Sequence, residues 1–178
     1  MLRASALAAV LAITGVPECL AQGDVKAAEY QVKAAFLYKF MGYVEWPARA
    51  QVGPETQLVI GVMGADALVD ELAQVVASRS VNGRPVAVRK LRPGDPIAGL
   101  RVLFIGQAAG ARAADVIAAA NANGVLTVTE TEEAFALGSV INFVIVQDKV
   151  RFDIALQQAE SANLKISSRL LAVARKVV

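Results

Sequence analysis

The feature of this chain that most limits its fold is a repeated alternation of short apolar runs with helical stretches. Residues 58–63, 101–105 and 125–129 are apolar runs with the length and composition of strands buried on both faces. Helical stretches at 66–78 and 111–122 follow the first two of these runs. Strands that alternate with helices are joined by crossover connections and form a mainly parallel sheet. We therefore predict one three-layer α/β domain, a doubly wound sheet of about six strands with helices on both faces.

The rest of the chain adds elements to this frame. A helix over 26–45 is expected to end at Trp46, because Pro47 disfavours helical geometry in the residue before it. Asp66 is predicted to cap the helix at 66–78, and Asn82-Gly83 to turn the chain into a strand at 85–90. Strands at 140–146 and 150–154, separated by 147–149, predict an antiparallel hairpin near the end of the chain. A helical turn at 132–136 and helices at 156–162 and 167–176 complete the prediction.

The first 21 residues have the pattern of a cleaved secretory signal peptide. Arg3 precedes an apolar run at 6–16, which is too short to cross a bilayer, and small residues at 19 and 21 suit a signal peptidase. Acylation of Cys19 is an alternative, but Pro17 and Glu18 stand where a lipoprotein signal has a small residue. We therefore expect one domain over residues 22–178, exported to the periplasm.

The missing residue types exclude much of enzyme chemistry. The chain has no histidine, and Cys19, its one cysteine, falls in the predicted signal peptide. Zinc or copper sites of the usual kind and histidine or cysteine catalysis are thereby disfavoured, so we expect a protein that is not an enzyme, with no metal and no cofactor. A net charge of +2 gives no reason to expect nucleic acid. No later segment reaches the roughly 18 apolar residues of a membrane span, so direct membrane insertion is not expected.

Two sets of side chains have residue types that could support catalysis. Glu130, Glu132 and Glu133 follow a predicted strand, but carboxylates there are favoured by the dipole of the next helix. Lys165, Ser167 and Ser168 contain the residue types of a Ser-Lys dyad, but helix capping by serine explains them better.

Glycines follow two of the predicted strands. In doubly wound sheets, ligands bind beyond the carboxyl ends of strands, where glycine permits close approach of the backbone. Gly64 and Asp66 follow the strand at 58–63, and Gly106 and Gly110 follow the strand at 101–105. These four residues are our candidate ligand contacts, although tight strand-to-helix turns explain the same glycines and neither segment is a nucleotide-binding motif.

Aromatic residues concentrate in residues 34–48, AAFLYKFMGYVEWPA, which hold five of the ten in the chain. Core packing is the expected role of Phe36 and Phe40. The apolar arc of the predicted helix is, however, broader than one contact with a sheet requires. Part of it is therefore expected to remain exposed and to contact a partner protein.

An ordered set of short motifs resembles the YfiR family of bacterial periplasmic proteins over nearly the whole chain beyond the signal peptide. The motifs are KAAFLYKF (33–40), VEWP (44–47), IGVMG (60–64), VLTV (125–128), GSVINF (138–143), VRFDI (150–154) and ISSRLL (166–171). The resemblance implies a compact α/β regulator that restrains a membrane-anchored diguanylate cyclase by binding its periplasmic sensor region, which lowers cyclic di-GMP and biofilm formation. It also implies a homodimer.

The resemblance and the aromatic stretch together nominate contact residues for the partner, and the sequence departs from the family at two points. The nominated contacts are Tyr38, Phe40, Tyr43 and Trp46, with Leu170 and Leu171 as alternatives. Relatives carry disulfide-forming cysteines, whereas the equivalent strand here begins with Arg101, so redox control by that route is not expected. Ala155 also replaces an asparagine of many relatives. A periplasmic small-ligand sensor that feeds a histidine kinase or another membrane receptor is the alternative function.

Overall fold

The computed structural model describes the backbone of residues 19–47 and 57–178, and the side chains from residue 25 onward within these ranges. The predicted signal peptide therefore lies almost entirely outside the described residues. Within the described part of the chain, no helix is both long enough and apolar enough to cross a membrane.

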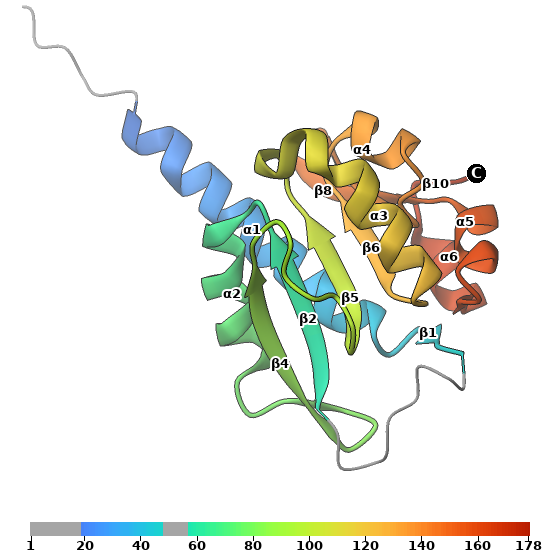
Figure 1. Cartoon of the computed structure of the whole chain (residues 1–178). Helices are drawn as coiled ribbons and strands as arrows, with labels where there is room; N and C mark the ends of the chain where they lie inside the picture. Colours follow the sequence, from blue (N-terminus) through green and yellow to red (C-terminus); the bar gives the residue numbers. More distant parts are fainter. Residues whose placement is uncertain (1–18, 48–56) are drawn as a thin grey trace, which may run out of the picture.

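A mixed, mainly parallel sheet forms the centre of the molecule, as predicted (Figure 1). Its eight strands lie in the order β10-β8-β7-β6-β5-β2-β4-β3, and the neighbours from β4 through β2, β5 and β6 to β7 are parallel. The bounds are β2 Leu58–Met63, β3 Ser80–Val81, β4 Arg84–Leu91, β5 Leu100–Ile105, β6 Leu126–Thr129, β7 Ile141–Val146, β8 Lys149–Ile154 and β10 Lys176–Val177.

Helices cover both faces of this sheet, which makes the fold doubly wound. Helices α1 (Cys19–Phe40) and α2 (Asp66–Val76) pack side by side on one face (Figure 1). The short helix η2 (Gln107–Arg112) and α3 (Ala113–Ala122) lie on the other. The chain winds outward from β2 to β4 and then returns to β5 on the far side of β2, so the direction of winding reverses between β2 and β5.

The predicted hairpin is β7 and β8, which pair antiparallel from Ile141↔Ile154 to Val146↔Lys149. Gln147 and Asp148 form the turn, both with positive φ, as the two central residues of a hairpin turn that matches strand twist require. The turn is one residue shorter than predicted. Helices α4 (Glu132–Ala136), α5 (Leu156–Ser161) and α6 (Ser168–Val173) also appear close to their expected places.

The first helix ends earlier than predicted, at Phe40 rather than at Trp46. The chain then turns, with the Gly42 N–H donating to the Lys39 carbonyl at 2.9 Å. It continues as β1 (Val44–Glu45), which pairs antiparallel with β9 (Lys165–Ile166). The residues expected to continue the helix instead pair with β9, more than a hundred residues away. A contact over such a distance leaves no pattern in the neighbouring sequence.

The last predicted helix is also shorter, and the chain end becomes a strand. Helix α6 ends at Val173, and β10 then adds to the sheet beside β8 in parallel. Arg175 fixes this arrangement, because its Nε donates to Asp153 Oδ1 at 2.7 Å and its Nη2 binds the other carboxylate oxygen. The predicted cap of α2 was wrong too: Ala65 is the N-cap, and Asp66 is an exposed first-turn residue paired with Lys90.

Candidate functional site

The aromatic residues that point inward from α1 belong to the core. Phe40 is fully buried, and its ring lies 5.9 Å from Phe143 and 5.1 Å from Phe152, centroid to centroid. Phe36 stacks on Phe40 at 5.9 Å and is only partly buried. The prediction that Phe40 presents exposed surface to a partner was wrong, because the opposing rings of β7 and β8 enclose it. Leu170, 4% exposed, is likewise part of the core.

The other nominated contacts keep accessible surface, and their role as partner contacts remains a prediction. Tyr43 is 39% exposed, and Leu171 is partly buried. Tyr38 is half-buried, and its hydroxyl donates to the Ser80 carbonyl at 2.9 Å. Trp46 is half-buried as well, with Nε1 donating to the Arg101 carbonyl at 3.1 Å. These polar contacts hold both rings against the body of the protein.

An apolar surface that the motifs did not single out lies along the outer side of α1. Val25 and Val32 are 69% and 43% exposed, and Ile145 near the tip of the hairpin is 50% exposed. With the partly buried Phe36 they border a cavity of about 460 Å³ between α1 and the β7–β8 hairpin. We call these four residues the α1 groove. The breadth of the apolar arc predicted such a surface, but it could not say which part of the arc stays exposed.

The two glycine turns do not form a single crevice between them. The Gly106 N–H donates to the Met63 carbonyl at 2.8 Å, and a Cβ on Gly106 would lie 2.5 Å from the Gly64 carbonyl oxygen. The backbones thus fill the point between β2 and β5 where ligands bind in many doubly wound folds. Gly106 and Gly110 border a small cavity of about 320 Å³, whereas Gly64 and Asp66 do not.

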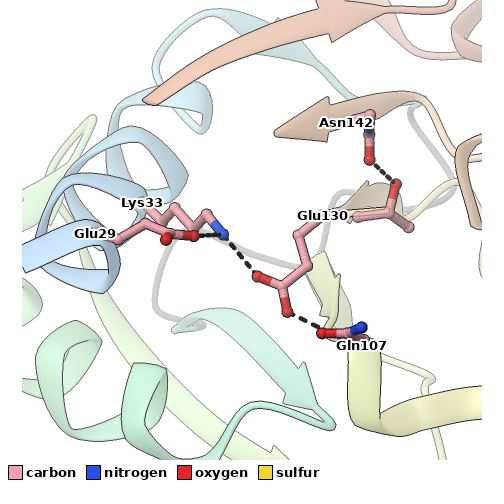
Figure 2. A network of polar contacts seen from close by, with 6 residues as sticks. Glu29, Lys33, Gln107, Glu130 and Asn142 are labelled. Carbon is pink, nitrogen blue, oxygen red and sulfur yellow. Dashed lines mark hydrogen bonds and ion pairs between the residues drawn. The ribbon is translucent and has the colours of Figure 1, made fainter. Parts of the chain in front are cut away.

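A cavity of about 660 Å³ lies one strand further along the same edge. Glu130, directly after β6, forms its floor, and the first half of α1 and the end of β7 form its walls. Figure 2 shows the polar network at its base: Lys33 donates to Glu130 at 2.6 Å and also pairs with Glu29. The other oxygen of Glu130 accepts from the Gln107 N–H at 3.0 Å.

Burial makes this network an unusual electrostatic environment. Lys33 is 3% exposed, and its ammonium lies over the rings of Tyr30 and Phe143 at 5.4 Å and 5.9 Å. Burial, followed by the charges of Glu130 and Glu29, raises the pKa of Tyr30 to about 12. Deeper in, the Thr129 hydroxyl donates to Asn142 Oδ1 at 2.9 Å, and Asn142 also borders the cavity.

The arrangement suits binding better than catalysis. Lys33 is held in ion pairs with the carboxylates of Glu29 and Glu130. Glu132 and Glu133 are exposed in the first turn of α4, where negative charge is favoured, and the Thr131 hydroxyl caps that helix. The Ser167 hydroxyl accepts from the Leu170 N–H, which is the capping role predicted for it. Among the described residues, no group of His, Cys, Asp or Glu is placed to hold a metal ion.

Comparison with known proteins then decides the family. A profile described as YfiR/HmsC-like, DUF4154, matches residues 30–175. The chain belongs to this family. YfiR-like proteins are periplasmic and regulatory, and act in the diguanylate cyclase pathway. The described structure of this YfiR-like chain has the predicted fold. The family match includes Val32, Phe36 and Ile145 of the α1 groove and, except for Glu29, the residues of the Glu130 network.

Solved structures support the fold. A conserved domain protein from Vibrio cholerae O1 biovar El Tor str. N16961 aligns with a TM-score of 0.59 at 12% identity, over 84% of this chain and 60% of the other. An ABC domain in complex with L-Trp from Streptococcus pneumoniae aligns with a TM-score of 0.53 at 11% identity, over 68% of this chain and 55% of the other. The YfiR-like chain thus spans little more than half of each. No curated protein matches its sequence.

Proposed function

We propose that this chain inhibits a membrane-anchored diguanylate cyclase by binding the cyclase's periplasmic sensor region through the α1 groove. The family supports a regulator with a membrane-bound partner. The observation that carries the choice of surface is the row of exposed apolar side chains from Val25 through Val32 to Ile145. Apolar residues gathered on one exposed face mark interaction sites more often than isolated ones do.

Inhibition follows if the groove binds the inactive form of the sensor better than the active form. A regulator shifts a two-state equilibrium only by the difference between its affinities for the two states. A preference of roughly 100-fold, about 2.7 kcal/mol, silences a receptor whose two states are equally populated. Tyr43, at the end of the turn that follows α1, and the half-buried Tyr38, Trp46 and Leu171 extend the proposed contact surface.

The test is the level of cyclic di-GMP in cells that lack the gene and are complemented with variants. Val32→Asp places a charge in the α1 groove. Because Val32 is 43% exposed, the substitution should change the free energy of unfolding by less than about 0.5 kcal/mol. Complementation with the native chain should lower cyclic di-GMP, and complementation with Val32→Asp should not.

Leu137→Asp is the control, because Leu137 is 50% exposed, follows α4 and belongs to no part of the proposed contact surface. It should lower cyclic di-GMP as well as the native chain does. Equal activity of the Val32→Asp chain, at equal abundance in the periplasm, would exclude the groove as the contact.

A second candidate function, a periplasmic small-ligand sensor, is favoured by the 660 Å³ cavity. Val25, Glu29 and Ile145 border both this cavity and the α1 groove, so an occupant of the cavity would touch residues that shape the contact surface. L-tryptophan is a reasonable first probe, since the S. pneumoniae domain of similar fold was solved with it. A saturable rise in the unfolding temperature with L-tryptophan, absent from the Glu130→Gln variant, would support the sensor function. If the temperature does not rise, the cavity does not bind an aromatic amino acid of this kind.

A further inference from the structure

A separate hollow of about 380 Å³ lies at the opposite edge of the sheet, where the parallel strands begin. Leu58 opens β2, Arg84 opens β4, and Arg101 is the second residue of β5, and all three border it. Trp46, from the segment that follows α1, forms a further wall. None of these residues contributes to the Glu130 network, and of them only Trp46 belongs to the proposed partner surface.

Arg101 is the unusual residue of this hollow. It is 4% exposed, and its Nη2 is buried without a hydrogen-bond partner. None of the ion pairs among the described residues involves it. Its guanidinium lies 5.8 Å from the centre of the Trp46 ring, a favourable contact that leaves the donor unsatisfied. Buried charges are normally paired, since an unpaired one carries a large desolvation penalty.

A second cation adds to the positive charge. Arg84 borders the same hollow, and after burial its charge is the next cause that lowers the pKa of Arg101. Among the described residues that line the hollow, Arg84 and Arg101 are cations and Glu45 is an acid. Two guanidinium groups that face one hollow favour an oxyanion, because a guanidinium presents donors in a fork that matches a carboxylate or a phosphate.

The remaining wall indicates which oxyanion fits. Met41, Val44, Leu58 and Val81 are buried apolar residues of this lining. A fully hydrated dianion gains nothing from such a wall, whereas an organic monocarboxylate can bury its apolar part against it. We infer that this hollow binds a small organic monocarboxylate, whose carboxylate meets Arg101 and Arg84 while its apolar body lies against this wall. The site shares Trp46 with the proposed cyclase contact surface but contains none of the four residues of the α1 groove.

Trp46 is the only tryptophan of the chain, so its fluorescence reports on this hollow directly. The purified protein is titrated with sodium hexanoate at constant ionic strength, and in parallel with neutral hexanamide and with sodium phosphate. We expect a saturable change with hexanoate and at least about tenfold weaker binding of hexanamide, because the amide lacks the charge. No saturable change with hexanoate, an equal response to hexanamide, or a response to phosphate alone would each overturn the inference.

Variants tie the response to the two guanidinium groups. Arg101→Met should abolish the hexanoate response, and Arg84→Gln should weaken it at least about fivefold. Arg151→Gln, which removes an exposed arginine from β8, should leave it unchanged. Without ligand, Arg101→Met should unfold at the same or a higher temperature, because it removes an unpaired buried charge. A fall of more than about 5 °C would show that the charge is satisfied within the protein, and would overturn the inference.

Discussion

At the scale of single residues, burial separates side chains that the sequence presents as equivalent. Phe40 and Tyr43 are three positions apart in one aromatic stretch, yet Phe40 is fully buried and Tyr43 is 39% exposed. The difference arises because the helix ends at Phe40 and the turn carries Tyr43 away from β7 and β8. Phe40 therefore contributes to the stability of the fold, whereas Tyr43 contributes to the accessible surface.

Phe40→Ala should consequently act on stability rather than selectively on binding. Removal of a fully buried phenylalanine typically lowers the free energy of unfolding by about 3–5 kcal/mol. Tyr43→Ala should lower it by less than about 1 kcal/mol, since part of that ring is already in water. Urea unfolding of both variants measures the difference, and similar values for the two would contradict the burial seen here.

A second prediction at the scale of single residues concerns Tyr30, whose phenol should ionise at a higher pH than an ordinary tyrosine. Its folded pKa of about 12 exceeds the unfolded value of 10.0. Because the unfolded chain loses this proton first, the contribution of Tyr30 to stability is complete below pH 10 and is lost as the pH rises toward 12. Absorbance of tyrosinate should show one late-titrating group, and Tyr30→Phe should remove it. An unchanged titration curve in Tyr30→Phe would show that another tyrosine is responsible.

At the scale of elements, the contact between the β2 and β5 turns decides where a cavity can form. The close approach of Gly64 and Gly106 closes the position where the winding of the sheet reverses. Beyond it, β7 runs past the end of β6, since Thr129 pairs with Asn142 and β7 continues to Val146. The cavity above Glu130 therefore lies between this overhanging strand and the first half of α1.

Gly106→Ala tests that close approach. A methyl group there would lie 2.5 Å from the Gly64 oxygen and 2.8 Å from the Ala65 Cβ, so the two turns would have to separate. We expect a loss of more than about 2 kcal/mol in the free energy of unfolding. Gly42→Ala is the control, because its added Cβ would lie 3.5 Å from the nearest atom, an ordinary contact. Equal effects of the two substitutions would refute the proposed packing.

At the scale of the whole molecule, the three proposed binding surfaces lie at three places on the domain. The α1 groove lies on the outer side of α1, the Glu130 cavity lies at the carboxyl edge of the sheet, and the Arg101 hollow lies at the amino edge. The groove and the Glu130 cavity share residues of α1 and the hairpin, whereas the Arg101 hollow is separate. A substitution in the Arg101 hollow can therefore leave the other two surfaces unchanged.

The stability of the whole molecule should not respond to reducing agents. The chain contains one cysteine, so no disulfide can form within it. Dithiothreitol should leave the midpoint of thermal unfolding of the exported protein unchanged. A shift of several degrees, together with a dimer that disappears on reduction, would show that Cys19 is retained and cross-links two chains, against the predicted cleavage after residue 21.

The sequence by itself determined the layered α/β architecture, because apolar runs alternate with helical stretches. The spacing of apolar residues within each stretch indicates which of its faces is buried. It also identified the hairpin and the cap at Ser167, which depend on neighbouring residues. Only the tertiary structure decided the end of α1, the strand β10, the burial of Phe40 and the meeting of Lys33 with Glu130. These depend on contacts between residues far apart in the chain, such as the 97 positions that separate Lys33 from Glu130, and no local pattern encodes them.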